Sequence, residues 1–277
     1  MDLASVTLTE LAPFVLGLLA AGLVAGLFAG FLGVGGGIII VPVLFYVFTI
    51  LGIDDAVRMH LAVGTSLGTI VPTSIRSLRA HAKKGAVDFE LLRSWIAPVL
   101  IGVIIGTALA ARVSSDALMG VFATVALVIA ANMAFGKKNW RLGDDLPSKP
   151  AQWGLAGVIG ALSAMMGIGG GTFGVTLLTL YGRTIHQAIA TSAGLGLIIS
   201  VPGVIGFIIS GWGEPALPPF SLGYVNLIGL ALIVPATVLT APWGAHFAHS
   251  ISRVALARAF AVFLVITSVR MFYGLLT

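Results

Sequence analysis

The stretch Phe31-Leu32-Gly33-Val34-Gly35-Gly36-Gly37 is a glycine cluster inside a long apolar sequence, where it should interrupt a helix. The same pattern, G-x-G-G-G, returns in Met165-Met166-Gly167-Ile168-Gly169-Gly170-Gly171, 134 positions later in a chain of 277 residues. Consecutive glycines disfavour a helix, since each costs about 1 kcal/mol relative to alanine. Non-helical backbone survives at membrane depth only where it is buried in protein or lines a wet cavity. Two matched breaks in matched halves are typical of the binding site of a secondary transporter.

Two other interpretations of the clusters have to be weighed. G-x-G-G-G could form a helix-packing surface, because small residues let backbones approach closely. Its occurrence in both halves favours a pair of helix breaks instead. A nucleotide-binding loop needs a strand before it, a helix after it and an acidic residue about 20 positions further on. The apolar flanks of both clusters exclude that loop.

The composition indicates a helical membrane protein. Hydrophobic residues make up 58% of the chain, charged residues only 9%, and the mean hydropathy is +1.09. Soluble domains carry about 25% charged residues. The absence of cysteine excludes disulfides, thiol catalysis and thiolate metal sites. We expect no metal site, no cofactor and no enzymatic activity, and the net charge of +5 does not imply nucleic acid, because the basic residues lie in short loops between apolar spans.

Apolar windows predict ten helical segments, at 11–32, 38–52, 61–78, 94–111, 117–135, 153–166, 172–182, 188–210, 222–241 and 254–276. The longest polar stretch divides the chain into a first transmembrane repeat (1–135), a cytoplasmic linker (136–152) and a second transmembrane repeat (153–277). The segments 38–52, 153–166 and 172–182 are shorter than the ~20 residues of a full span. Because these segments flank the clusters, each cluster should separate two partial helices that are re-entrant or strongly bent. The predicted fold is an all-α polytopic membrane protein with two repeats of about five segments.

The two halves match at a second place. His60-Leu-Ala62-Val-Gly64-Thr65-Ser66 aligns with His186-Gln-Ala188-Ile-Ala190-Thr191-Ser192, and a proline follows later in each predicted helix, at Pro72 and Pro202. Two motifs in the same order after each glycine cluster predict an internal duplication.

Lysine and arginine predict the orientation in the membrane. With the loops at 79–93 and 136–152 in the cytoplasm, twelve of the fifteen basic residues lie inside, and Arg58, Arg112 and Arg270 lie outside. The first half then begins outside and the second begins inside, so the repeats are inverted and both termini are external. Inverted repeats place a substrate site near the midplane, at their interface.

The clusters offer a site for an anion. A broken helix exposes free backbone N–H groups at the start of its second piece, and the helix dipole attracts negative charge there. Hydroxyl groups of the paired Thr-Ser motifs could add donors, although such side chains also bond to the preceding turn of their own helix. The predicted substrate-binding residues are Gly33, Gly35, Gly36, Gly37, Thr65, Ser66, Gly167, Gly169, Gly170, Gly171, Thr191 and Ser192. His60 and His186 are candidates for gating or proton coupling, because histidine titrates near neutral pH; the other interpretation is an interfacial residue.

All ten carboxylates fall in predicted loops or near the N-terminus. Carriers of cations usually bury a carboxylate, so this distribution favours an anionic substrate.

In its doubled G-x-G-G-G, the A-x-[GA]-T-S after each cluster, its length and its two-half layout, the chain resembles the sulfite exporter TauE/SafE family. The resemblance covers nearly the whole chain. It implies a bacterial or archaeal inner-membrane transporter that exports small sulfur-containing anions such as sulfite or organosulfonates by alternating access. An anion channel and a membrane assembly or anchoring protein without transport activity remain the alternatives. The expected partners are a small anionic substrate and the lipid bilayer.

Overall fold

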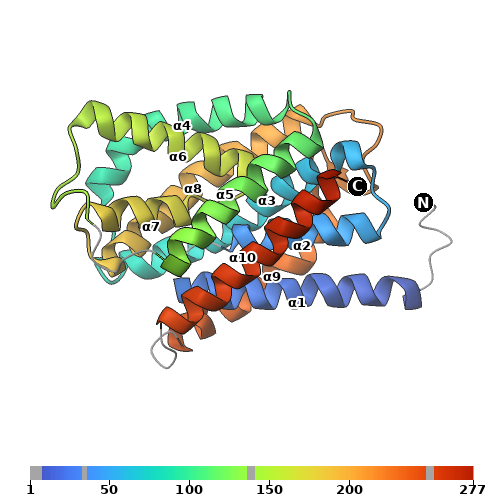
Figure 1. The fold of residues 1–277 in the computed structure, drawn as a ribbon, viewed down its shortest axis with the longest axis horizontal. Helices are drawn as coiled ribbons and strands as arrows, with labels where there is room; N and C mark the ends of the chain where they lie inside the picture. Colours follow the sequence, from blue (N-terminus) through green and yellow to red (C-terminus); the bar gives the residue numbers. More distant parts are fainter. Residues whose placement is uncertain (1–7, 33–35, 136–140, 248–252, 277) are drawn as a thin grey trace.

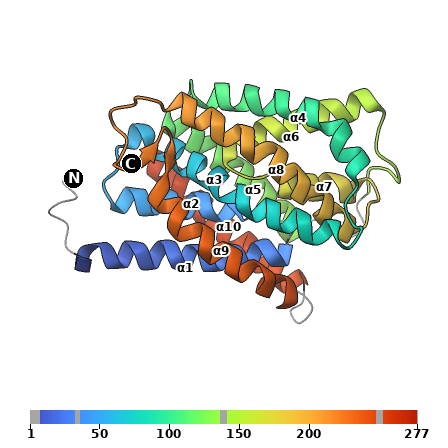
Figure 2. The same cartoon turned by 180° about the vertical axis from the view of Figure 1, so that it is seen from behind.

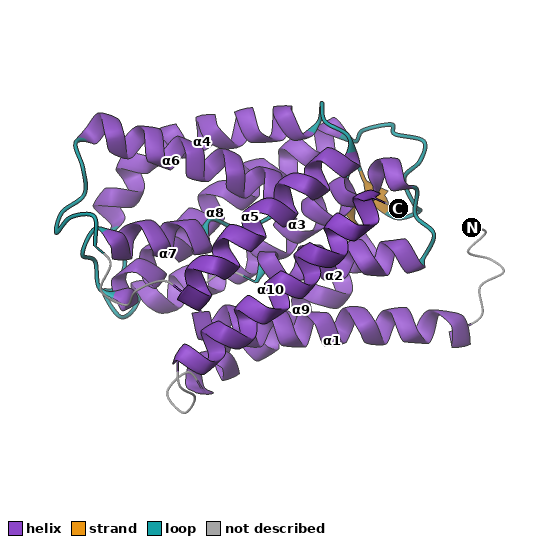
Figure 3. Ribbon diagram, in the orientation of Figure 1, coloured by secondary structure: helices purple, strands orange, loops and turns teal. Residues whose placement is uncertain are grey.

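The computed structural model describes residues 8–32, 36–135, 141–247 and 253–276, which form ten helices and one two-stranded hairpin (Figure 1). In chain order these elements are α1 (Leu8–Leu32), α2 (Gly37–Ile50), α3 (Asp55–Ala82), α4 (Phe89–Ala110), α5 (Ser115–Phe135), α6 (Lys149–Met166), α7 (Gly171–Leu180), α8 (Ile185–Ser210), β1 (Ser221–Leu222), β2 (Val225–Asn226), α9 (Leu227–Phe247) and α10 (Arg253–Leu276). The predicted all-α polytopic fold is confirmed. Several predicted boundaries are displaced by a few residues: the segment expected at 61–78 extends from Asp55 to Ala82, and the one expected at 94–111 begins at Phe89. The segment expected from residue 222 begins as an antiparallel hairpin, with Ser221 opposite Asn226 (Figure 3).

The lengths and compositions of the helices are those of a multi-pass membrane protein. Four described segments are long and apolar enough to cross a membrane: α4, α5, α8 and Ala257–Leu276 of α10. The helices α2 and α7 are apolar but have only 14 and 10 residues. A span needs about 20 residues, so neither can cross alone.

Glycines set the closest helix contacts outside the two clusters. A Cβ atom added at Gly102 or Gly106 of α4 would lie less than 3.0 Å from a backbone oxygen of α6. A Cβ atom at Gly26 of α1 would lie 2.6 Å from the Thr237 carbonyl oxygen of α9. Membrane helices pack by such close backbone approach, so the pairs α4–α6 and α1–α9 depend on small residues.

Most of the closely packed helix pairs correspond between the two halves, whereas α3 packs on α5 without a comparable contact of α8 with α10 among the described residues. The helix α1 packs along α9 and α4 along α6; α2 packs on α3 and α7 on α8; α3 packs on α9 and α4 on α8. If α1–α5 are matched in order with α6–α10, each of these contacts becomes the one named beside it: the pair α1–α9, for example, becomes α6–α4. The pairs α3–α8 and α5–α10 join matched helices, so each is its own counterpart. A duplicated chain with a two-fold relation between its halves would produce this pattern.

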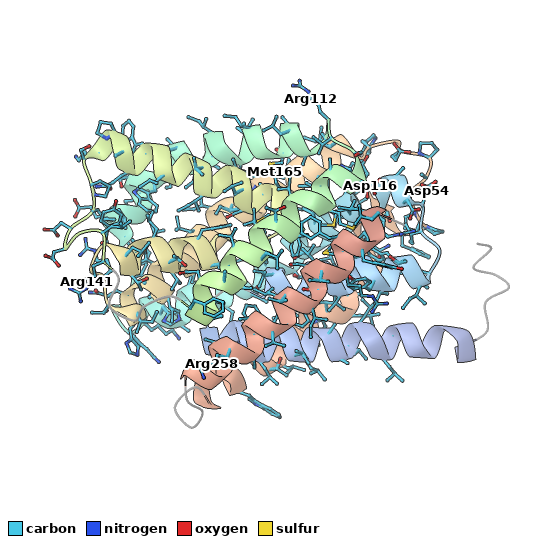
Figure 4. All side chains as sticks on the ribbon, viewed as in Figure 1. Asp54, Arg112, Asp116, Arg141, Met165 and Arg258 are labelled. Atoms are coloured by element: carbon cyan, nitrogen blue, oxygen red, sulfur yellow. The ribbon has the colours of Figure 1, made fainter. Side chains whose placement is uncertain are left out.

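The bundle has two distinct ends (Figure 4). At one end, which we call the basic end, lie Arg141, Arg258 and the loop that joins α3 to α4. At the other, which we call the terminal end, α1 begins and α10 ends, near Asp54 and Arg112. The helix α1 therefore starts at the opposite end of the bundle from α6 (Figure 1).

The long helices α3 and α8 cross the middle of the bundle and pack against each other (Figure 2). Each begins at a side-chain cap, since Asp54 accepts a hydrogen bond from Ala56 N–H (2.9 Å) and Thr184 from Gln187 N–H (3.3 Å). A capping oxygen satisfies one of the N–H groups that the first turn leaves free. Both helices contain their proline, Pro72 and Pro202.

Candidate functional site

The two glycine clusters interrupt helices and meet in the interior. Gly33 and Gly35 lie outside the described residues, but Gly36 and Gly37 are buried at the start of α2. A Cβ atom at Gly37 would lie less than 3.0 Å from the Gly167 carbonyl oxygen and 3.1 Å from Ile168 Cα. The start of α2 therefore touches the turn between α6 and α7. From this meeting point α2 leads toward the terminal end and α7 toward the basic end (Figures 1 and 2).

Left-handed backbone turns create the breaks. Gly167 ends α6 with φ +66°, and Gly170 precedes α7 with φ +69°. Gly36 occupies the same place before α2, with φ +72°. Residues with a Cβ atom rarely adopt such angles. The glycines at these three positions are thus required by backbone conformation.

The Thr-Ser pairs lie where α3 and α8 pass the breaks. Ser66 donates a hydrogen bond to the Gly167 carbonyl oxygen (2.8 Å), which ties α3 to the second break. Thr65 accepts a hydrogen bond from Asn226 N–H (2.8 Å), and Thr191 accepts one from Asp88 N–H (3.0 Å). Ser192 is buried, and its hydroxyl has no partner among the described residues. Three of the four hydroxyls therefore hold other elements in place, and one is free.

The two histidines have different surroundings. His60 is 4% exposed; its ring stacks on Tyr224 with centroids 4.9 Å apart, and its Nε2 lies 2.9 Å from the Ala110 carbonyl oxygen. Because a carbonyl only accepts, Nε2 must donate, which leaves Nδ1 without a partner among the described residues. His186 is exposed at the start of α8. The pair thus lies in opposite halves of the molecule, one member inside the protein and one on its surface.

A cavity of about 210 Å³ opens at the basic end and reaches the Thr-Ser pair of α8. Its wall includes Asp88, Leu178, Arg183, Gln187 and Thr191. Arg183 Nη2 lies 3.8 Å from Asp88 Oδ2, so an ion pair joins the loop after α3 to the loop after α7 across this cavity. The cavity therefore reaches α8 at Thr191, the first residue of its Thr-Ser pair.

A second hollow follows one face of α3. This groove has a volume of about 590 Å³ and is lined by Pro72, Ile75, Arg76, Arg79, Ala80 and Lys83. Three of its six residues carry positive charge, and the groove extends from the middle of α3 toward the basic end. Such a surface raises the local concentration of anions.

The buried interior of the described chain holds no Asp or Glu, and its buried polar groups are hydroxyls, one imidazole and one amide. No cluster of three metal-ligating side chains occurs among the described residues. Uncharged hydroxyls and helix N-termini can bind an anion by donated hydrogen bonds. The buried polar groups of the described interior are therefore mostly hydroxyls, which can donate hydrogen bonds to a ligand.

Sequence reasoning missed Asn226 and Ser163. Asn226 bonds to Thr65 through its N–H group and accepts from Gly229 N–H (2.8 Å), but it lies 161 positions after Thr65 in the chain. Ser163 is buried one turn before Gly167, outside both motifs. Neither residue has a counterpart in the other half that would have identified it as a candidate.

The ten described helices and the two glycine breaks are those of a multi-pass helical membrane protein. The sequence profile of the sulfite exporter TauE/SafE family matches residues 18–271, so the chain belongs to that family. It is 34% identical to a probable membrane transporter protein of Haemophilus influenzae over 263 residues, which cover 94% of this chain and 98% of that protein. It is 29% identical over 229 residues to a probable membrane transporter protein of Methanocaldococcus jannaschii, covering 79% of this chain and 80% of that protein. No solved structure matches the chain.

Proposed function

We propose that this protein is a secondary transporter that exports small sulfur-containing anions, such as sulfite or organosulfonates, by alternating access. The observation that carries the proposal is the contact between the two glycine breaks, at Gly37 and Gly167, in an interior where the described residues bury no carboxylate. Helix breaks that meet inside a bundle place free N–H groups where an anion can bind. The family profile favours sulfur anions as the substrate class.

The proposed orientation puts the basic end in the cytoplasm and both termini outside, in the cytoplasmic membrane of a bacterium or archaeon. Lysine and arginine concentrate on cytoplasmic loops, and the labelled Arg141 and Arg258 both lie at the basic end. The two halves then act as inverted repeats, and the corresponding helix pairs support this relation. Transport would be a rocking of one half against the other around the fixed central site.

The two hollows at the basic end fit an inner vestibule. The groove along α3 would attract the anion through Arg76, Arg79 and Lys83. The cavity beside Thr191 would then lead inward once the Asp88–Arg183 ion pair separates. Exposed ion pairs contribute only about 0–1 kcal/mol, so this pair can open and close readily.

Counterflow in proteoliposomes tests the transport mechanism. Vesicles preloaded with unlabelled sulfite should accelerate the uptake of labelled sulfite, because a carrier exchanges its substrate across the membrane. Currents through single channels without exchange would establish the channel alternative instead. Neither exchange nor current with any tested anion would leave the assembly or anchoring role.

A thermal-shift screen identifies the substrate class. Sulfite, sulfate, thiosulfate, taurine and sulfoacetate are tested against chloride at matched ionic strength. A ligand that binds only the folded state stabilises it by about 2.7 kcal/mol at one hundred times its Kd. Stabilisation by the sulfur anions and not by chloride is expected; equal effects of all salts would contradict the proposed substrate.

A further inference from the structure

Unpartnered hydroxyl groups gather around the second glycine break. Five buried Ser or Thr hydroxyls have no hydrogen-bond partner within the part of the chain that the structure describes: Ser163, Thr172, Ser192, Ser200 and Ser268. The first four belong to α6, α7 and α8, and only Ser268 lies elsewhere, in α10. Native proteins leave few buried polar groups without a partner, and each of these calls for a reason.

Two of these hydroxyls face the first turns of α7. Ser163 Oγ lies 3.7 Å from the position that a Cβ atom at Gly170 would take, and Ser192 Oγ lies 2.6 Å from the corresponding position at Gly174. Leu195 approaches both of these glycine positions, so the two serines face the same side of α7. Both side chains are at least 99% buried. Glycine at 170 and 174 leaves the backbone of α7 open to them.

The N-terminus of α7 begins at Gly171, directly after Gly170. The regular hydrogen bonds of this helix begin with Gly174 N–H donating to the Gly170 carbonyl oxygen (2.7 Å). The N–H groups of residues 171–173 therefore precede the first helical bond, as in every α-helix. They carry the positive end of the helix dipole, and the two serine hydroxyls add donors beside them.

The sequence of the first half differs at the positions that correspond to these donors. Because the two clusters are 134 residues apart in the sequence, Ser163 corresponds to Ala29 and Thr172 to Ile38, and both of these residues are apolar. The counterpart of Ser192 is Ser66, whose hydroxyl already donates to the Gly167 carbonyl oxygen. Among the described residues, the unpartnered hydroxyls of α6, α7 and α8 therefore lie on the helices around the second break, although the motif occurs in both halves.

We infer that Ser163, Ser192 and the N-terminal amides of α7 form one oxyanion-binding subsite at the second break. This inference rests on the proposed function. It states which groups of the protein donate hydrogen bonds to the oxygen atoms of the substrate, which are those of sulfite or of a sulfonate group. The end of the Ile199 side chain lies beside Gly170, where an added Cβ atom would come within 3.0 Å of it. Ile199 is fully buried, so its side chain has to turn away before an anion can approach Gly170.

The test measures sulfite binding to Ser163→Ala, Ser192→Ala and the matched control Ser268→Ala by thermal shift and by calorimetry in detergent. A hydrogen bond to a charged group is worth enough for each of the first two variants to raise the Kd for sulfite about 10- to 100-fold. Without ligand, all three variants should melt at or above the wild-type temperature, because each removes an unpartnered buried hydroxyl. Ser268→Ala should keep the wild-type Kd.

The outcomes separate the subsite from the function. Sulfite binding with the wild-type Kd in both Ser163→Ala and Ser192→Ala overturns the subsite and leaves the transporter intact. A fall in the melting temperature of the ligand-free variants also overturns it, because the hydroxyls would then have structural partners. A wild-type protein that neither binds any of the five anions nor supports counterflow overturns the proposed function, and the subsite with it.

Discussion

Replacing Gly37 by alanine tests whether the two hairpins meet as described. The φ angle of Gly37 lies outside the left-handed region, so alanine introduces no backbone strain there. Its methyl group would, however, come less than 3.0 Å from the Gly167 carbonyl oxygen and 2.9 Å from Ile70 Cδ1. Ordinary contacts begin at 3.4 Å, so the oxygen has to retreat by more than 0.4 Å, the difference between 3.4 and 3.0 Å.

This displacement should weaken the protein in two ways. Overpacking a buried site costs about 1–3 kcal/mol, and a stretched Ser66–Gly167 hydrogen bond (2.8 Å in the wild type) loses about 1 kcal/mol more. Together they predict a loss of roughly 2–4 kcal/mol, and an apparent Tm in detergent lower by on the order of 5–10 °C. Counterflow should be strongly reduced, because the displaced carbonyl belongs to the turn before α7.

Two further variants make the result specific. Gly154→Ala adds the same methyl group to an exposed position of α6 with no atom within 4 Å, and should be neutral or stabilising by up to about 1 kcal/mol. Ser66→Ala should lower the free energy of unfolding less in the Gly37→Ala variant than in the wild type, because the effects of two substitutions in the same contact do not add. If Gly37→Ala melts and transports like the wild type, the hairpins do not touch at this point.

Four other predictions follow from the same structure. Gly170→Val should abolish counterflow while the protein still inserts, because a β-branched residue at φ +69° is strained by about 1–3 kcal/mol; normal transport would reduce this cluster to a packing role. Alkaline phosphatase fused after the last residue should be active and a fluorescent protein dark, since the C-terminus is proposed to be external, and fluorescence there would reject the inverted repeats. The chain has no native cysteine, so Thr191→Cys should react with a charged thiol reagent from the cytoplasmic side, and it should react faster when Arg183→Gln removes the ion pair. Equal reaction rates would show that the ion pair does not control access to Thr191. His60→Ala should lower the apparent Tm through the loss of a buried hydrogen bond and a ring stack, together roughly 1–3 kcal/mol, and unchanged melting would contradict its structural role.

The pattern of residues along the chain was sufficient to predict the class, the number of helices and the positions of the breaks. Hydropathy separates the ten segments because a membrane span has to be apolar over its length. The breaks follow from the glycine clusters, because consecutive glycines weaken a helix locally. Both effects depend on neighbours in the sequence, so they can be recognised without knowledge of the fold.

The contacts between distant segments could not be predicted in this way. The Thr-Ser pairs look equivalent in the sequence, yet Ser66 is bonded to Gly167 and Ser192 has no partner among the described residues. The hydrogen bond from Asn226 to Thr65 joins residues 161 positions apart, and no local pattern records it.

Tertiary structure alone therefore decided which donors are used to hold the bundle together and which remain free at its centre. The sequence by itself determined where each helix breaks, because backbone conformation is a local property of glycine. The partner of a buried hydroxyl depends instead on which helices lie against each other. Among the described residues, that choice leaves unpartnered hydroxyls on α6, α7 and α8, the helices around the second break.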